Sequence, residues 1–334
     1  MNHRKSSWRL RLAGLVWLGG AVGQAAEQDW LGLLNQAKRQ ELNGEYKAAS
    51  QTLREALRIA EQSRLGPPAL APTLNNAGSV AQDLGQYVEA EKYYRQSIAN
   101  WEAAGDFGVN LSRPLHNLAT LYARTGRYRM AQRMHQQVLE ILTRALGTRH
   151  PNVARVLISY GLAHHAQGDL EKAERSYREA QEILRDVKTA AGVDLGTLQT
   201  NLASLLVTRG SYQEAAKLAA EGAASLEKSL GTEHPALVPA LTWRGIAAIK
   251  LGAYAEAADL LQRAVSLAKR SLGEEHPRLA FALKAQAELL HSQNRKGEAR
   301  RLQKQAKTIL ASHQRENLLG HTVDFHSLLA ASEK

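Results

Sequence analysis

The 334-residue chain contains no cysteine, only eight prolines, and few aromatic residues, which make up 5% of the sequence. Without thiols it has no disulfide framework, zinc ribbon, iron–sulfur cluster or cysteine nucleophile. The scarcity of aromatic residues disfavours a β-sandwich or barrel, because the strands of such folds are rich in them. Apolar residues still amount to 44% of the chain, which is enough to fill a core and excludes a wholly disordered protein.

The common catalytic motifs are also missing. The sequence has no H-E-x-x-H zinc motif, no G-x-S-x-G nucleophile elbow and no G-x-x-x-x-G-K-[ST] phosphate-binding loop. Acidic and basic residues are instead scattered along stretches with helical periodicity, which is typical of solvated helix faces. We therefore expect a protein that is not an enzyme and that has no catalytic residues, cofactor or metal site.

The first 25 residues have the composition of a secretory signal peptide. An apolar run over residues 12–22 follows a basic start, and small residues precede a predicted cleavage after Ala25. The basic start consists of Arg4, Lys5, Arg9 and Arg11. The apolar run is too short for a transmembrane helix, which needs about 20 apolar residues, and no later segment is long enough either. An uncleaved anchor or a chance apolar stretch is the alternative to a cleaved signal.

Cleavage after Ala25 would remove four positive charges from the formal net charge of +11 and leave +7. We accordingly expect an exported protein, periplasmic or secreted, with no integral membrane span in its mature form. Because export separates a protein from nucleic acid, we expect no nucleic-acid partner.

An internal repeat governs the rest of the chain. Glycine recurs every 41 or 42 residues, and asparagine takes the seventh place: Gly44, Gly85, Gly126, Gly168, Gly210, Gly252 and Asn294. Five residues after each of them stands an alanine: Ala49, Ala90, Ala131, Ala173, Ala215, Ala257 and Ala299. Small residues also stand seven before the turn: Ala37, Gly78, Ala119, Gly161, Ala203, Gly245 and Ala287. Periodicity at this length is the signature of a solenoid.

The repeat predicts two helices that meet at the glycine. Apolar residues on both sides follow the helical period, as in Leu115, Leu118 and Tyr122. Glycine readily adopts the left-handed conformation that ends a helix, and asparagine tolerates it, which explains Asn294. The small residues let the two helices approach closely, and successive pairs must stack because one pair cannot bury its apolar face.

These residues carry a family resemblance. The segment NLATLYARTGRYRMAQRMHQQVL (117–139) resembles a tetratricopeptide repeat, whose usual unit has about 34 residues. The longer unit here contains the connectors LGTRHP (146–151), LGTEHP (230–235) and LGEEHP (272–277). They resemble the long repeat subtype of kinesin light chains. The resemblance implies an all-α, right-handed superhelical solenoid of seven antiparallel helix pairs.

The histidines of these connectors, His150, His234 and His276, stand one per repeat and therefore too far apart to share a metal ion. We expect each histidine to precede its helix in an extended conformation, with the proline in the first turn.

The predicted organisation is a signal peptide (1–25), seven repeats (26–310) and a capping segment or tail (311–334). The last segment lies outside the repeat and is expected to cover the final hydrophobic face. A partner-docking segment is the alternative.

Nine residues before each turn, the first helix of the repeat carries asparagine in four of seven units: Asn35, Asn76, Asn117 and Asn201. Asparagine is a poor residue for a helix interior, so this column needs a reason. Its amide can both donate and accept, as the main chain of an extended peptide requires. The resemblance implies that these asparagines hold a ligand's backbone in the concave groove; bonding between neighbouring helices is the alternative.

The same register places further side chains in the predicted groove: Arg113, His116, Arg124, Arg155, His165 and Lys250. The three arginines make the groove basic, which favours an acidic or carboxylate-ended protein segment as partner. Apolar residues (Trp243, Ile246, Ile249, Phe281) form a strip in the last two units, which either anchors a partner or packs beneath the tail.

We therefore predict an exported scaffold that binds an extended peptide segment of a partner protein. The alternative is a binding module for an anionic envelope polymer or surface. It would use the basic groove together with residues 295–307, which contain six basic residues and one acid.

Overall fold

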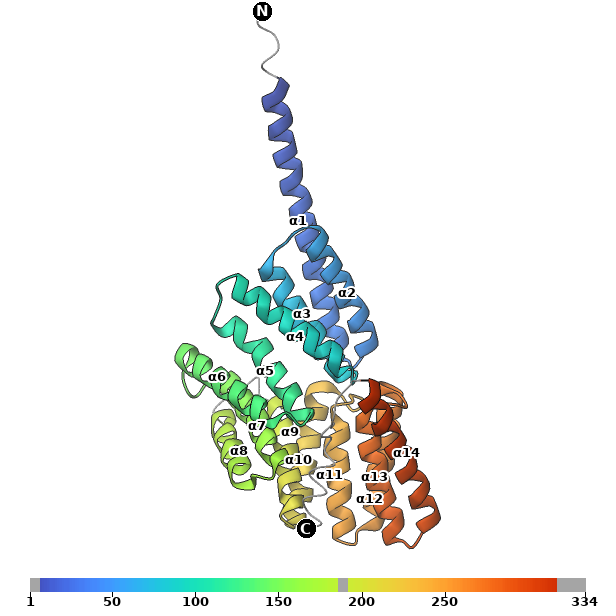
Figure 1. The fold of residues 1–334 in the computed structure, drawn as a ribbon. Helices are drawn as coiled ribbons and strands as arrows, with labels where there is room; N and C mark the ends of the chain where they lie inside the picture. Colours follow the sequence, from blue (N-terminus) through green and yellow to red (C-terminus); the bar gives the residue numbers. More distant parts are fainter. Residues whose placement is uncertain (1–6, 186–191, 317–334) are drawn as a thin grey trace, which may run out of the picture.

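The computed structural model describes residues 7–185 and 192–316, and every regular element in these ranges is an α-helix. The helices are α1 (Ser7–Leu42), α2 (Tyr46–Gln62), α3 (Pro67–Asp83), α4 (Tyr87–Ala103), α5 (Val109–Arg124), α6 (Tyr128–Leu146), α7 (Pro151–Gln167), α8 (Leu170–Arg185), α9 (Gly192–Thr208), α10 (Tyr212–Leu230), α11 (Leu237–Lys250), α12 (Tyr254–Leu272), α13 (Pro277–Ser292) and α14 (Lys296–Glu316). Each odd-numbered helix pairs with the even-numbered helix that follows it, which confirms the seven predicted pairs (Figure 1).

Helix α1 is longer than the predicted first repeat. It runs unbroken from Ser7 to Leu42, so no helix end marks the predicted boundary after residue 25. Its first part projects from the body of the molecule (Figure 1). Of the helices in the described ranges, none combines the length and the apolar character that crossing a membrane requires.

The turns have the predicted backbone conformation. The six turn glycines have φ between 74° and 91°, and Asn294 has φ 61°. Side chains with a Cβ disfavour this left-handed region, whereas glycine enters it freely and asparagine at a small cost. The turn column is therefore fixed by backbone geometry.

The alanine column lies at the helix–helix contacts. All seven alanines are at most 1% exposed. In the column seven residues before the turn, a Cβ built on Gly161 would lie 2.6 Å from the Tyr177 ring, and one on Gly78 would lie 2.5 Å from the Tyr94 ring. Helices of one repeat therefore approach so closely that glycine is required where a large ring faces it.

The array curves around its odd-numbered helices, which we call the inner helices. Successive inner helices contact each other, as α7 contacts α9 and α11 contacts α13. Within the described ranges, the even-numbered, outer helices make no comparable contact with one another. Because the inner helices are closer together, they line the concave side.

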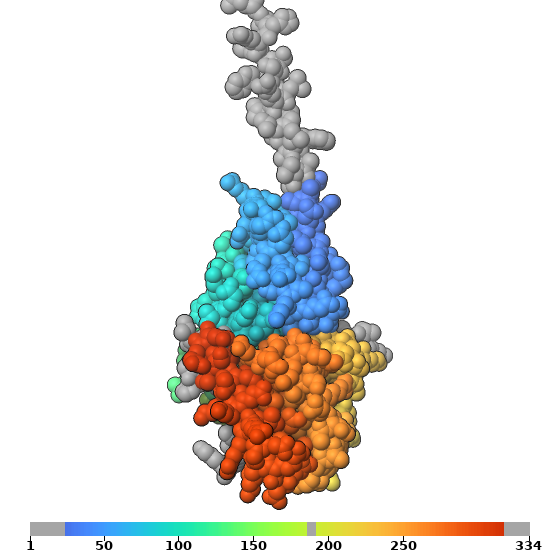
Figure 2. Space-filling view, turned by 90° about the vertical axis from the view of Figure 1, so that its right-hand side faces the viewer, coloured from blue at the N-terminus to red at the C-terminus, as the bar shows by residue number. Residues whose placement is uncertain are grey.

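The curvature brings both ends of the array into contact, in what we call the seam. The turns after α1 and α3 lie against the connectors before α11 and α13 and against α14. Figure 2 shows the amino-terminal repeat in blue seated directly on the carboxy-terminal repeats in orange and red. The seam comprises Glu41, Gly44, Asp83 and Gly85 on one side and His234, Pro235, His276, Pro277, Arg278 and His313 on the other.

The connector histidines mostly behave as predicted. His150 and His276 are extended, with ψ 140° and 136°, and each precedes a proline in the first turn of its helix. Helix α11 is an exception, because it begins at Leu237, two residues after Pro235.

The boundary predicted at residue 310 falls inside α14, which continues to Glu316 and buries Ile309 and His313. Residues 311–316 therefore extend the last repeat. The remainder of the predicted capping segment, residues 317–334, lies outside the described residues.

Close packing at the glycine column can be tested with Gly161→Ala. The added methyl group would collide with the Tyr177 ring, and overpacking of this kind costs about 1–3 kcal/mol. Urea unfolding followed by circular dichroism should show the midpoint falling accordingly. The double variant Gly161→Ala/Tyr177→Leu should recover part of the loss, and an unchanged midpoint in the single variant would contradict the contact.

Candidate functional site

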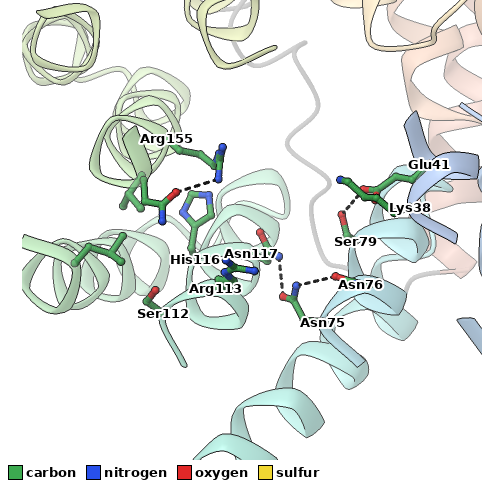
Figure 3. Close-up of a pocket in the computed structure, with 13 residues that line it drawn as sticks. Lys38, Glu41, Asn75, Asn76, Ser79, Ser112, Arg113, His116, Asn117 and Arg155 are labelled. Atoms are coloured by element: carbon green, nitrogen blue, oxygen red, sulfur yellow. Dashed lines mark hydrogen bonds and ion pairs between the residues drawn. The ribbon is translucent and has the colours of Figure 1, made fainter. Parts of the chain in front are cut away.

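A polar pocket of about 390 Å³ opens on the concave side between the first four inner helices (Figure 3). Its lining comprises Lys38 and Glu41 from α1; Asn75, Asn76 and Ser79 from α3; Ser112, Arg113, His116 and Asn117 from α5; and Asn152, Arg155 and Val156 from α7, with Leu142 from α6. Five of the ten predicted site residues lie here: Asn76, Arg113, His116, Asn117 and Arg155.

Helical spacing explains why these side chains share one face. Each inner helix contributes lining residues three or four positions apart, as Arg113 is from His116 and Asn117. Residues at this spacing project from the same side of a helix. Because the repeat places the four inner helices in register, their polar faces meet around one cavity.

Amide groups line the wall formed by α3 and α5. The Asn117 amide nitrogen donates to the Asn75 side-chain oxygen at 2.9 Å, and the Asn75 amide nitrogen donates to the Asn76 oxygen at 3.4 Å. This chain satisfies only part of the hydrogen-bonding capacity of three amides. The Asn117–Asn75 bond connects neighbouring helices, which is the alternative interpretation of the asparagine column, and the amides still have hydrogen-bonding capacity toward the pocket.

The charges around the pocket are unequally compensated. Asp194 on α9 accepts two hydrogen bonds from Arg155, at 3.0 and 2.8 Å, and neutralises it. Lys38 pairs with Glu41 at 3.5 Å. Arg113 is exposed and, in the described ranges, has no ion pair. Arg113 is therefore the cation that can attract an anionic group, and the groove is less basic than its three arginines suggest.

Burial shifts the pKa of His116 and that of Glu41 toward the uncharged form of each group. Burial lowers the pKa of His116 to about 4, and the Arg155 cation contributes. The His116 ring packs against the ring of His135, at 5.4 Å between centroids. Burial also raises the pKa of Glu41, mainly by desolvation. At neutral pH, His116 therefore offers the pocket a neutral ring.

The other predicted residues lie away from this pocket. Asn35 is exposed on α1, and Lys250 at the end of α11 forms an ion pair with Glu288 at 2.9 Å. Arg124, at the end of α5, is half-buried. It lies close enough to the seam for its positive charge to contribute to the lowered pKa of His276.

The predicted groove positions of His165 and Asn201 need correction, because their side chains are only 1% and 5% exposed. The His165 ring lies within hydrogen-bonding distance of Thr208 Oγ1 (3.2 Å) and Ser204 Oγ (3.4 Å) on α9. It therefore connects two inner helices. The error arose because the register fixes the helix face but not how closely the next helix covers it.

The apolar strip is also buried. Trp243, Ile246 and Phe281 are 0% exposed and Ile249 is 5% exposed, within a core cluster that includes Ala247, Ala285 and Leu289. The Trp243 and Phe281 rings contact at 5.1 Å between centroids. The strip thus contributes to packing between α11 and α13.

Sequence reasoning missed several pocket residues, namely Lys38, Glu41, Asn75, Ser79, Ser112 and Asn152. Some could have been found from helical spacing, since Lys38 and Ser79 stand three residues after column asparagines. Asp194 could not, because it belongs to no repeated column and acts from the next repeat. Among the described residues, no group of three or more histidine or acidic side chains is arranged to hold a metal ion.

Models of known families match most of the chain. One tetratricopeptide repeat model matches residues 69–144, 110–186 and 238–312, and a second matches residues 195–236. The chain belongs to the tetratricopeptide repeat family. This confirms the resemblance seen in the sequence, and such a fold is typically a non-catalytic scaffold for interactions with other proteins.

Among curated tetratricopeptide repeat proteins, the chain is similar to the mitochondrial tetratricopeptide repeat protein 19 of Rattus norvegicus, with 26% identity over 131 residues. The match covers 39% of this chain and 35% of the rat protein, so the chain spans about a third of that relative's length.

Solved structures of tetratricopeptide repeat proteins are also similar. A putative kinesin light chain of Podosopora anserina with nearly identical repeats is 26% identical, with a TM-score of 0.45, covering 61% of this chain and 96% of its own. The quorum sensor NprR of B. thuringiensis in its apo form is 16% identical, with a TM-score of 0.56 and coverage of 85% and 87%. NprR in complex with its cognate peptide NprX is 16% identical, with a TM-score of 0.62 and coverage of 91% and 86%. The NprR structures share the fold with this chain.

The buried histidines predict acid sensitivity of this tetratricopeptide repeat array. Burial lowers the pKa of His165 to about 4 and that of His135 well below its usual value. Unfolding lets these rings bind protons, so the stability they contribute is complete above about pH 6.5 and is lost as pH falls toward 4.

Urea midpoints measured between pH 7 and pH 4.5 should therefore decrease steadily. The variant His165→Asn removes one such titration and should show a smaller decrease. A midpoint that stays constant over this range would contradict the predicted protonation states.

Proposed function

We propose that this chain is a non-catalytic scaffold whose polar pocket binds an extended, acidic segment of a partner protein. The proposal rests on one observation. Asn75, Asn76 and Asn117, whose amides have unused hydrogen-bonding capacity, line the same concave cavity as Arg113, which has no ion pair in the described ranges. Amides of this kind can bond the main chain of a peptide, which has no partners of its own when it is extended. Arg113 adds a preference for a carboxylate.

The pocket geometry suits a chain segment better than a small metabolite. Four successive helices contribute polar side chains, so the recognised groups are spread along the concave surface. An extended peptide presents a main-chain donor or acceptor at every residue and can bond to groups spaced in this way. Solved NprR, which shares the fold, is described as a complex with its cognate peptide, and this supports a peptide as ligand here.

The charge pattern limits the partner's chemistry. Arg155 is neutralised by Asp194, and Lys38 pairs with Glu41, so among the described residues that line the pocket Arg113 is the cation without an ion pair. We therefore propose a segment with a single carboxylate near its point of contact, from an acidic side chain or a chain terminus. A densely anionic ligand would find too few free cations here.

The pocket assignment can be tested by selecting extended peptides from a display library on the wild-type chain and titrating the best peptide into variants. Asn117→Ala and Arg113→Ala should each weaken binding about tenfold, which corresponds to about 1.4 kcal/mol for a lost hydrogen bond or charge-assisted contact. Circular dichroism would check that the variants keep their helices.

Asn35→Ala is the matched control, because Asn35 occupies the same repeat column but lies outside the pocket. The affinity of this variant for the selected peptide should equal that of the wild type. Equal losses in all three variants, or none in the pocket variants, would refute the assignment of this pocket.

The alternative ligand is an anionic envelope polymer. Helix α14 carries exposed Arg300, Arg301, Lys304 and Lys307, which favour such a surface contact. Attraction between exposed charges is screened within about 10 Å at 0.1 M salt. Binding that disappears on raising salt from 0.05 to about 0.5 M and survives Asn117→Ala would therefore favour the polymer over the peptide.

We also propose that the chain is exported, with residues 1–25 as a cleaved signal. The first buried side chain in the described part is Trp30, whose indole nitrogen donates to Thr73 Oγ1 at 2.9 Å. Residues 24 and 25 are exposed, so the proposed cleavage after Ala25 lies before the first side chain described as buried.

Expression of the full-length chain in a bacterial host should therefore yield a periplasmic form that begins at Ala26, as determined by intact mass. A variant that starts at residue 26 should unfold at the same urea concentration as the processed chain. Recovery of the unprocessed chain from the cytoplasmic fraction alone would contradict export.

A further inference from the structure

Three connectors with the same sequence pattern make the same local contact. In each, histidine Nδ1 accepts a hydrogen bond from the amide two residues later, at 3.1 Å for His150, 3.1 Å for His234 and 3.0 Å for His276. Because Nδ1 accepts, the ring proton of the neutral form is on Nε2, which remains free to donate.

Only two of these histidines use that second nitrogen in the described structure. His234 Nε2 donates to the carbonyl oxygen of Glu41 at 3.3 Å, and His276 Nε2 donates to that of Asp83 at 3.0 Å. Both contacts join residues 193 positions apart. For His150 no second bond is recorded within the described ranges. All three histidines thus make the local contact at the start of a helix, and two of them also contribute to the seam.

The seam has further specific contacts. Arg278 forms an ion pair with the Asp83 carboxylate at 3.1 Å, with side-chain exposures of 14% and 24%. His313 Nε2 lies 2.7 Å from the carbonyl oxygen of Gly85. A buried ion pair that loses one partner leaves an uncompensated charge, so these contacts select one relative position of the two ends.

The turn glycines of the first two repeats have a second role at the seam. A Cβ on Gly44 would lie 2.7 Å from Pro235 Cδ, and one on Gly85 would lie 3.2 Å from His313 Nε2. At Gly252, with the same left-handed φ, a Cβ would meet nothing within 4 Å. The tyrosines two residues after these turns differ in the same way, since Tyr46 is 4% exposed and Tyr254 is 38% exposed.

The seam and the pocket are linked through α1 and α3, and Glu41 belongs to both. The Glu41 carbonyl accepts from His234, whereas its carboxylate lies in the pocket, paired with Lys38 and 3.5 Å from Ser79 Oγ. Asp83, bound by His276 and Arg278, ends the helix that carries Asn75, Asn76 and Ser79 into the pocket. The carboxyl ends of α1 and α3 are therefore fixed from the far end of the chain.

We propose that His234, His276 and Arg278 are positioning residues, which hold the α1 and α3 wall of the pocket at a fixed separation from α5 and α7. Opening the seam moves that wall and changes the width of the pocket. The inference rests on the proposed function only in taking the pocket as the binding site, and its tests need no ligand.

The first test inserts a methyl group into the seam. Because the chain has no cysteine, Lys47→Cys and Glu275→Cys place spin labels only at these two exposed positions, one on each side of the seam. Gly44→Ala in this labelled chain should broaden the distance distribution and shift it to longer values. Gly252→Ala imposes the same backbone strain without a seam contact and should leave the distribution unchanged.

The second test compares the loss of a connector histidine at the seam with the loss of one outside the seam. His276→Ala should accelerate amide hydrogen exchange about tenfold in residues 38–44 and 79–86, because local opening there becomes easier. His150→Ala removes the same helix cap without the seam bond, and should accelerate exchange only near the start of α7. Circular dichroism would verify that both variants remain helical.

The conservative variant Arg278→Lys keeps the charge beside Asp83 and should retain most of the protection that Arg278→Met loses. The proposal is overturned if Gly44→Ala and Gly252→Ala give the same distance distribution, or if His276→Ala leaves exchange in α1 and α3 at the wild-type rate. If the seam tests succeed and no peptide binds the pocket, the proposed function fails and the seam stands.

Discussion

The structure depends on the close approach of paired helices at columns of small residues. Alanine at the fifth position after each turn is almost completely buried in all seven repeats, and glycine stands seven residues before the turn where a tyrosine or Leu261 faces it. A larger side chain at these positions would separate the helix axes. Because these columns recur in every repeat, each pair can stack on the next, and the rotation between neighbouring repeats accumulates into curvature.

Curvature creates both the pocket and the seam. Because the inner helices line the concave side, side chains about 40 residues apart in sequence come together there, as Asn75 and Asn117 do. Continued over several more repeats, the curvature brings together residues 193 positions apart. Contacts of the first kind follow from neighbouring repeats, whereas those of the second kind depend on the sum of all the rotations between them.

The charges of the pocket also depend partly on the repeat register and partly on a residue outside the repeated columns. Arg113 and Arg155, which the sequence register places on the concave side, both line the pocket. Asp194, which neutralises Arg155, comes from α9 and has no counterpart in the repeat columns. His165 was placed on the correct helix but is buried against Ser204 and Thr208. The difference between Arg113 and Arg155 therefore depends on one acid that belongs to none of the repeated columns.

The amino-acid sequence by itself determined the helix pairs, their turns and the inward column of asparagines, because these depend on local backbone preferences that recur every 41 or 42 residues. The tertiary structure alone decided which column members stay accessible and which arginine has no ion pair in the described part of the chain. It also decided that two of the three similar connectors close the array. Those outcomes depend on how closely distant helices approach. Local periodicity does not encode that distance, since it results from the accumulated geometry of every intervening repeat.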